Sequence, residues 1–360
     1  MSKNIKSISN PKLKLEILTT EEVKKIHEAT LWIIEHVGVR FPSQRALEIW
    51  EANGATVDRE KKIVRVRGDV IEEALKKCPP AYPLAARDPE QDLPLDGKHV
   101  YLGTDGCGVE VIDIHSGEKR TSCLTTGPVT LAGNLAVGNA EVIAATALLQ
   151  LAYPGAPVFY AAAQTASDLR LGCYTGGGPE DYLFGAATNV LSDFYNIPLS
   201  MGSFATGAKE PNWQAGIDGS LSTFMASIVM SDMLLGCGFL HGSRIWSYAE
   251  MMMDCEIFSI IHKMMQGIVV DEETLALDTI AKVGPGGHYL AQKHTRKHMR
   301  ELFMPQFMDR RPYSEWEEKK DDARNWAVNK ARRILAEHCP EELDPKISAE
   351  MAKIIQSVEK

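Results

Sequence analysis

Five side chains that can contact a small charged molecule stand at or just beyond the ends of short apolar segments. Three are aromatic, and aromatic faces attract cations. The other two are a histidine and an arginine, which can donate hydrogen bonds to a carboxylate. They are Tyr160, Phe204, His241, Arg244 and Trp246. We treat these five as candidate binding residues, and the elements around them must bring them together.

Those elements repeat one order, a short strand followed by a small-residue loop and a helix. Residues 197–201 form an apolar run of strand length, and a helical pattern covers 213–232. Segments 158–163 and 234–241 begin two similar units. Consecutive units of this kind predict parallel strands in a barrel or a doubly wound sheet, with ligands bound where the strands end.

Three of the candidates also have a purely structural explanation. Phe204 suits a core position between sheet and helix, His241 suits a satisfied buried histidine, and Arg244 suits an exposed surface. If the strands are parallel, their carboxyl ends and the following loops share one face. We therefore predict that Phe204 points to that face, near His241 and at least one of Tyr160 and Trp246.

Histidines and acidic residues later in the chain suggest two further chemistries. His294 and His298 are four residues apart on one predicted helix face, with Glu301 nearby. The zinc pattern His-Glu-x-x-His is not present there, because 295–297 reads Thr-Arg-Lys. We predict helix capping and packing for these histidines and no metal site. Asp254 and Glu256 could instead oppose a bound cation.

Composition limits the class of protein. The chain has 360 residues and a net charge of −9, which argues against nucleic acid as the main partner. We find no apolar run of membrane-helix length and no apolar signal core near residue 1. The seven cysteines are odd in number and lack C-x-x-C spacing, as expected for free thiols. We expect a cytoplasmic protein without a membrane partner.

Three regions differ in character. Residues 1–124 alternate helical and strand patterns and predict an α+β region. Residues 125–305 are rich in glycine, alanine and methionine and contain the βα units, whereas 306–360 read as a charged helical tail. A complete eight-unit barrel needs about 250 residues. The middle region is too short for that, so the sequence predicts an incomplete parallel barrel.

Stretches along almost the whole chain resemble, in the same order, those of the trimethylamine methyltransferase family. No single stretch is specific, and the order carries the resemblance. The stretches are 16–39, Asp113-Ile-His-Ser-Gly-Glu-Lys-Arg120, Gly127-Pro-Val-Thr-Leu-Ala-Gly133, Asn139-Ala-Glu-Val142, Asp168-Leu-Arg170, Gly178-Pro-Glu180, Lys209 with Gln214-Ala-Gly216, Gly284-Pro-Gly-Gly-His-Tyr-Leu290, and His294-Thr295 with His298.

The chain departs from the family in two places. A long barrel segment normally lies between the hairpin and Gly127-Pro-Val-Thr130, whereas here Cys123-Leu-Thr-Thr126 joins them directly. This indicates an internal deletion near Thr126. The founding members carry pyrrolysine where this chain has 202–205, and none is present here. The chain therefore resembles the non-pyrrolysine branch, which acts on quaternary amines such as glycine betaine, proline betaine or carnitine.

The resemblance implies a TIM-barrel-like fold, incomplete in this chain, and a methyltransferase. Its reaction would move a methyl group from a quaternary amine to the cob(I)alamin of a partner corrinoid protein, with no tightly bound cofactor of its own. Phe204, Tyr160 and Trp246 would hold the ammonium group. His241 and Arg244 would hold a carboxylate.

The deletion leaves alternatives open. The chain could be a non-catalytic quaternary-amine-binding protein or an inactive truncated paralogue, and a different βα enzyme acting on a small cation is a third interpretation. Loss of a strand would also leave a sheet edge open. An open edge pairs readily with another chain, so we expect a homo-oligomer.

Overall fold

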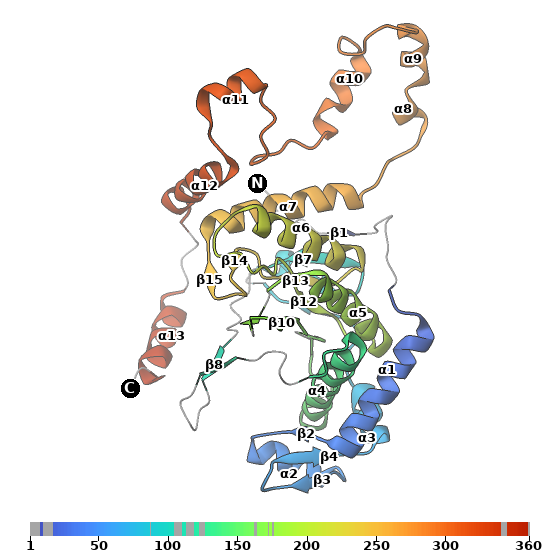
Figure 1. Cartoon of the computed structure of the whole chain (residues 1–360), viewed down its shortest axis with the longest axis vertical. Helices are drawn as coiled ribbons and strands as arrows, with labels where there is room; N and C mark the ends of the chain where they lie inside the picture. The colour runs from blue at the N-terminus through green and yellow to red at the C-terminus, as the bar shows by residue number, and fades with distance from the viewer. Residues whose placement is uncertain are drawn as a thin grey trace.

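The structure is a computed structural model that combines helices with small sheets (Figure 1). It describes residues 8–9, 17–86, 88–103, 110–112, 119–121, 127–161, 164–171, 173–174, 176–339 and 344–358. The hairpin turn at 115–118 and the junction at Cys123–Thr126, both singled out in the sequence, lie outside these ranges.

The N-terminal part is an α+β layer. Helix α1 (Thr20–Trp32) begins at a capping box, in which Thr19 and Glu22 each accept a backbone N–H from the other, and the helix continues as a π turn (Ile33–Val37). Further elements are α2 (Gln44–Ala52), α3 (Gly68–Leu75) and an antiparallel sheet of β2 (Val39–Arg40), β4 (Ile63–Arg65) and β3 (Thr56–Asp58).

Short hairpins follow. Strand β5 (Tyr82–Leu84) pairs with β6 (Leu93–Leu95), and a 3-10 turn (Pro89–Gln91) lies between them. On the two sides of residues 113–118, within the family stretch 113–120, β8 (Glu110–Ile112) and β9 (Lys119–Thr121) pair antiparallel. A further two-stranded piece joins β10 (Ser167–Asp168) to β11 (Cys173–Tyr174).

The main sheet has the order β1-β7-β13-β12. Strands β12 (Ser200–Gly202), β13 (Met233–Leu235) and β7 (His99–Leu102) are parallel, whereas β1 (Ile8–Ser9) pairs antiparallel with β7. Tyr160 adds a parallel bridge to Leu199 beyond β12. The predicted parallel pairing of the three units is therefore confirmed. Strand β7 of this sheet belongs to residues 1–124, which were predicted to form a separate α+β region.

One predicted element differs in extent. The segment 234–241 is not one strand, because the chain turns after β13 and forms β14 (Phe239–Leu240), which pairs antiparallel with β15 (Ile245–Trp246). Gly236 and Gly238 make that turn with φ of 116° and 90°, a conformation that costs glycine little. The residues on both sides of Gly138 form one long helix, α4 (Leu131–Ala152).

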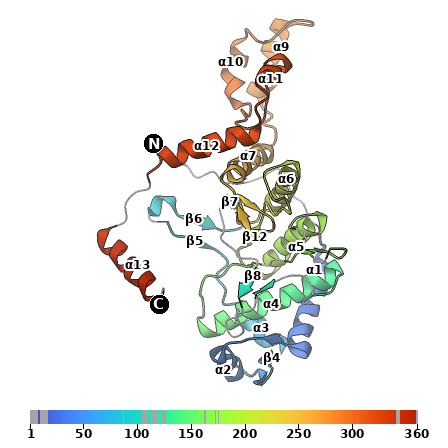
Figure 2. The same cartoon turned by 60° about the vertical axis from the view of Figure 1, so that its left-hand side comes forward.

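Four helices surround the sheet (Figures 1 and 2). They are α4, α5 (Pro179–Tyr195), α6 (Trp213–Ile228) and α7 (Tyr248–Met265). Helix α4 packs on α1 and α3, α5 packs on α6, and α6 packs on α7. One buried core spans these helices, the sheet and the N-terminal layer.

Helix α4 is long and apolar enough to cross a membrane by length and composition, so the expectation that no apolar run of that length is present was wrong. Half of its most apolar window is buried inside the protein. Its polar residue Asn139 is fully buried and accepts a hydrogen bond from the Tyr160 hydroxyl at 2.6 Å. The same amide donates to Thr30 at 2.7 Å and Tyr195 at 2.8 Å. These contacts are those of a core helix.

The C-terminal part leaves the body. Residues 267–304, which we call the arm, contain α8 (Glu272–Leu275), α9 (Leu277–Val283) and α10 (Lys293–His298), followed by a 3-10 turn (Met299–Glu301). The arm projects away from the sheet in both views, together with α11 (Tyr313–Lys319). Helix α12 (Ala323–Glu337) returns to pack on α7, and α13 (Pro345–Val358) lies apart.

One carboxylate, just before β13, links the segments that lead into the two strands beside β13. Asp232, which is 4% exposed, accepts the Gly97 N–H at 2.7 Å and the Leu199 N–H at 2.9 Å. Its own carbonyl accepts the Tyr101 N–H at 2.9 Å. Burial raises the pKa of the Asp232 carboxyl, and the two backbone donors oppose that rise. Asp232 thus connects the turn before β7 to the segment that leads into β12.

We expect Asp232→Ala to lower the free energy of unfolding by roughly 3 kcal/mol, because it removes two hydrogen bonds to a charged group and leaves buried backbone donors without an acceptor. Chemical denaturation monitored by circular dichroism measures this loss. Asp278→Ala, at an exposed position in α9, serves as the control and should change stability by less than about 0.5 kcal/mol. Equal, small effects of both substitutions would contradict the role of Asp232.

Candidate functional site

The loops after β12 and β13 are joined to each other at the carboxyl ends of the strands. The Ser203 N–H donates to the Leu235 carbonyl at 2.6 Å, where both strands end. Farther out, the His241 N–H donates to Ala208 at 2.7 Å, and the Gly242 N–H donates to Thr206 at 2.9 Å. Backbone bonds along the whole length of the two loops hold them as one unit.

Backbone strain marks this unit. Phe204 has φ of 55°, His241 of 51° and Ser243 of 66°, all in the left-handed region. Each such residue costs on the order of 1–3 kcal/mol and persists only where its surroundings fix it. At Gly236 a Cβ atom would lie 2.4 Å from the Ser203 carbonyl oxygen, so the loops approach too closely for any larger residue. Strain of this kind is concentrated at functional sites.

A third segment reaches the same face. Asp218 of α6 accepts hydrogen bonds from the Thr206 hydroxyl at 2.8 Å and from the Tyr182 hydroxyl at 3.0 Å. At Gly176 a Cβ atom would lie 2.7 Å from the Thr206 carbonyl oxygen. The segment before α5 therefore packs directly against the loop after β12. Asp218 anchors that loop from the helix side.

An open cavity of about 460 Å³ lies between the β14–β15 hairpin and helix α12. Two aromatic rings in its wall, Trp246 and Tyr248, meet edge to face with centroids 4.5 Å apart. Both are partly exposed, at 39% and 51%. Aromatic faces that remain accessible can receive a cation that cannot donate hydrogen bonds.

Cationic side chains stand in the same wall. Lys209 comes from the loop after β12, and Arg324 and Arg332 come from α12. Arg324 pairs with Glu210 at 2.9 Å, and the Lys209 ammonium donates to the Gly207 carbonyl at 2.5 Å. The cavity therefore combines aromatic rings with donors for an anion, which suits a small zwitterion.

The five predicted residues do not meet in one place. Trp246 lines the cavity, whereas Phe204 is only 2% exposed and belongs to the main core. Tyr160 is fully buried, with its hydroxyl turned to Asn139 of α4. His241 is half-buried within the strained loop, and Arg244 is exposed next to the hairpin. A binding role for each of the five, Trp246 included, stays a prediction.

Sequence reasoning did not select three cationic residues of the cavity. Lys209 appeared only inside a family stretch, and Arg324 and Arg332 belonged to the predicted charged helical tail. Their contribution depends on α12 packing against α7, more than 70 positions away from Trp246 in the chain. No local pattern in the sequence signals that contact.

Two buried carboxyl groups lie one turn apart on α7, close to the cavity. Glu250 is 3% and Asp254 0% exposed, and one oxygen of each finds no hydrogen-bond partner among the described residues. The other Asp254 oxygen accepts the Gly238 N–H at 2.7 Å. Burial raises the pKa of Glu250 to about 7. Burial, with the nearby Glu250 charge, also raises the pKa of Asp254.

Glu256, the other acidic candidate, has a structural partner. Its carboxylate accepts the backbone N–H groups of Gln306, Phe307 and Met308 at 2.6 to 3.1 Å. These contacts fix the chain where it returns from the arm to α7. Glu256 is therefore committed to holding the C-terminal part in place.

Comparison with known proteins identifies relatives. The sequence model described as trimethylamine methyltransferase (MTTB) matches residues 1–126 and 121–359. A glycine betaine methyltransferase from Desulfitobacterium hafniense (strain Y51) is 29% identical over 465 aligned positions, covering 95% of this chain and 97% of that protein. Trimethylamine methyltransferase MttB from Methanosarcina barkeri is 35% identical over 236 positions, covering 65% of this chain and 48% of that protein.

The alignments also locate a gap. An alignment of 465 positions exceeds the 360 residues of this chain, so more than a hundred positions of the Desulfitobacterium protein have no counterpart here. The two stretches matched by the family model meet at 121–126. Both findings agree with the internal deletion predicted near Thr126.

The Glu250 carboxyl should make stability depend on pH. Its pKa is about 7 in the folded protein against a usual 4.5, so the folded state holds this proton more tightly than the unfolded chain. Stability then falls as pH rises from about 4.5 to 7. We expect the free energy of unfolding of Glu250→Gln to fall over this pH range by on the order of 2–3 kcal/mol less than that of the parent protein. This follows from roughly 1.4 kcal/mol per unit of pKa difference.

Chemical denaturation at pH 5 and pH 8 tests this expectation. Glu28→Gln, at an exposed position in α1, provides the matched control and should leave the difference between the two pH values unchanged. A Glu250→Gln variant with the same pH dependence as the parent protein would contradict the assignment.

Proposed function

This chain belongs to the trimethylamine methyltransferase family, and we propose that it demethylates a quaternary amine of the glycine betaine, proline betaine or carnitine type. The acceptor is the cob(I)alamin of a partner corrinoid protein. The cavity at the β14–β15 hairpin carries this proposal, because it offers accessible aromatic rings and cationic side chains in one wall. The similarity to a glycine betaine methyltransferase over nearly the whole chain supports it.

In the proposed complex, Trp246 and Tyr248 face the ammonium group, and Arg324 or Lys209 faces the carboxylate. A quaternary ammonium has no N–H to donate, so ring faces are its natural partners. The carboxylate selects a betaine over trimethylamine, since only a betaine satisfies the cationic side of the cavity. In this proposal, Phe204, His241 and Arg244 fix the conformation of the loops that border the cavity wall.

The reaction demands orientation more than proton transfer. A reduced corrinoid supplies the nucleophile that takes the methyl group. The amine nitrogen keeps both electrons of the broken C–N bond and leaves as a neutral tertiary amine, so no side chain has to donate a proton. The protein must align the N–CH₃ bond with the acceptor. Loops fixed by mutual backbone hydrogen bonds suit that task.

We propose that the fold is a TIM-like barrel that lacks its middle units. The order Tyr160–β12–β13–β7 supports this, because the last parallel strand of the chain lies next to an early one, as in a closed barrel. A barrel uses about 30 residues per unit. The more than one hundred missing positions would therefore supply three or four units.

The same gap supports a second candidate function. Without its middle units the chain could bind a quaternary amine and not turn it over, as a binding protein or an inactive truncated paralogue. The cavity is built from residues after the gap and would remain in either case. Binding and methyl transfer must therefore be measured separately.

We expect the wild-type protein to transfer a methyl group to a reduced corrinoid protein from at least one of glycine betaine, proline betaine and carnitine. The absorption spectrum of the corrinoid cobalt measures this transfer. Trp246→Ala should weaken binding of that betaine by up to about thirtyfold, since a cation–π contact contributes roughly 0.5–2 kcal/mol. Trp213→Ala, 80% exposed and outside the cavity, is the matched control and should bind normally.

A ligand that has the quaternary ammonium but no carboxylate tests the aromatic side of the cavity independently of its cationic side. Arg324→Gln should weaken binding of the betaine and leave binding of tetramethylammonium unchanged. Betaine binding without methylation by any corrinoid protein would favour the binding-protein alternative. Binding that is equally strong in the parent and in Trp246→Ala would remove the cavity from the proposal.

We also propose that the protein is a cytoplasmic homo-oligomer. Four cysteines of the described residues, Cys78, Cys237, Cys255 and Cys339, are free thiols, as in a reducing compartment. The arm exposes several large apolar side chains to solvent, among them Ile268, Val270, Leu277 and Leu290. Burial of these side chains between subunits would stabilise an assembly. Light scattering should give a dimer or larger species, and a monomer would contradict the proposal.

A further inference from the structure

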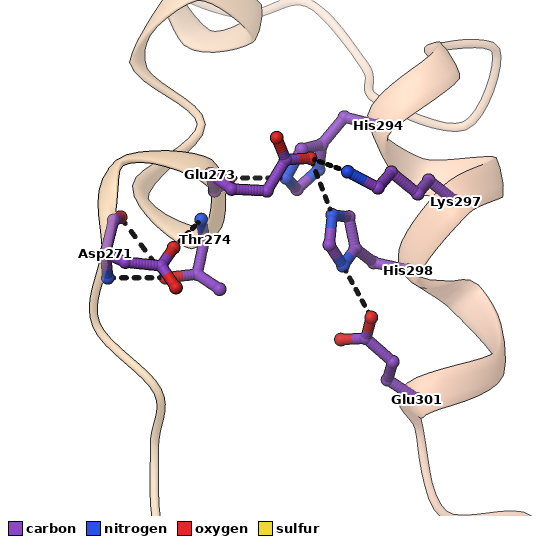
Figure 3. A network of polar contacts seen from close by, with 7 residues as sticks. All are labelled: Asp271, Glu273, Thr274, His294, Lys297, His298 and Glu301. Carbon is purple, nitrogen blue, oxygen red and sulfur yellow. Dashed lines mark hydrogen bonds and ion pairs between the residues drawn. The ribbon is translucent and has the colours of Figure 1, made fainter.

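We infer that the arm contains a binding site for a divalent cation of the zinc class, formed by Glu273 of α8 and by His294 and His298 of α10. The local sequence offered only Glu301 as an acidic neighbour of the two histidines. The fold adds Glu273, which is 21 residues before His294 and comes from the other side of the arm (Figure 3). This site is distinct from the proposed amine cavity, which the arm does not line.

The donor atoms already lie close together. One ligand atom from each of Glu273, His294 and His298 lies within 4.8 Å of the other two. The His298 Nε2 atom is 3.0 Å from the Glu273 Oε1 atom, and the two imidazole centroids are 4.4 Å apart. Zinc bound by His nitrogens and a carboxylate needs metal–ligand distances of about 2.0–2.2 Å. The His294 Nε2 atom lies 3.0 Å from the Glu273 backbone carbonyl oxygen, so an ion held through Nε2 would replace that contact while the side chains close around it.

The second ring nitrogen of His298 provides an independent indication. Its Nδ1 atom is 2.7 Å from the Glu301 carboxylate, as Figure 3 shows. Histidines that bind metals usually donate their other ring N–H to a carboxylate or carbonyl, which fixes the tautomer and directs the free nitrogen at the ion. Glu301 holds His298 in that orientation, with Nε2 turned toward Glu273.

The site opens onto a cavity. Glu273 and His294 line a hollow of about 520 Å³ between α8–α9 and α10. Two histidines and one glutamate form a ligand set that zinc uses with a fourth position left for water. The hollow provides room for that water. An ion held by both sides of the arm would cross-link α8 to α10.

One cation in the structure competes with the ion. The Lys297 ammonium lies 2.7 Å from the same Glu273 oxygen. Its side chain is 62% exposed, so it can move into solvent when the ion binds. Because of this competition, a metal site and a simple ion-pair network predict different effects when Lys297 is replaced. Removal of Lys297 weakens an ion-pair network but should strengthen binding of a metal ion.

Equilibrium dialysis of the full chain against Zn²⁺, after chelator treatment and removal of any affinity tag, tests the inference. We expect one ion per chain with a micromolar or lower dissociation constant, and Co²⁺ in its place should give the visible absorption of a four-coordinate site. Glu273→Gln, His294→Ala and His298→Ala should each weaken binding more than about tenfold, and Glu301→Gln by roughly 10–100-fold. Lys297→Gln should tighten it.

His288→Ala, at an exposed position in the same arm, is the matched control and should bind as the parent does. Circular dichroism checks that each variant keeps its fold, and protection of the arm from limited proteolysis by Zn²⁺ reports the cross-link directly. Uptake that falls short of one ion per chain would overturn the inference. Uptake that survives loss of both His294 and His298 would do so as well.

Discussion

The Asp232 carboxylate is the contact on which the central sheet depends. It binds backbone N–H groups from Gly97, in the turn before β7, and from Leu199, at the entry to β12. These two segments are about a hundred residues apart, and the deletion near Thr126 lies between them. Both donors are backbone N–H groups. Loss of their acceptor would leave them without a hydrogen-bond partner, which destabilises the fold. Asp232 thereby joins the parts of the chain on either side of the gap into one sheet.

The sheet in turn fixes the loops that border the cavity. Once β12 and β13 are paired in parallel, the segments after them must leave on the same side, and they bond to each other through Thr206, Ala208 and their partners. The close approach at Gly236 and the left-handed Phe204 and His241 show how tightly this arrangement is determined. Helix α12 then adds its arginines from the tail. Aromatic and cationic groups therefore meet because of packing and not because they are near in sequence.

The protein combines a firmly packed half with a projecting one. The helices from α1 to α7 share one core, whereas the arm has few buried residues and relies on polar contacts such as those of Glu273 and His298. Short helices like α8 and α10 are marginal when isolated in water. The arm has no buried core of its own among the described residues. A bound ion, a neighbouring subunit or both would provide the stabilisation that a core would otherwise give. The amine cavity and the arm thus depend on different kinds of stabilisation.

The sequence by itself determined the elements that depend on local periodicity and capping. Periodicity predicted helix α6 and the parallel pairing of the three strand segments, and the family resemblance predicted the internal gap. Only the tertiary structure decided which side chains face each other. It turned Tyr160 to Asn139, placed Phe204 in the core, and brought Arg324 to Trp246 and Glu273 to His298. The reason is physical: periodicity fixes which face of a segment is buried, whereas the partner across that face comes from a distant part of the chain that leaves no mark on the local pattern.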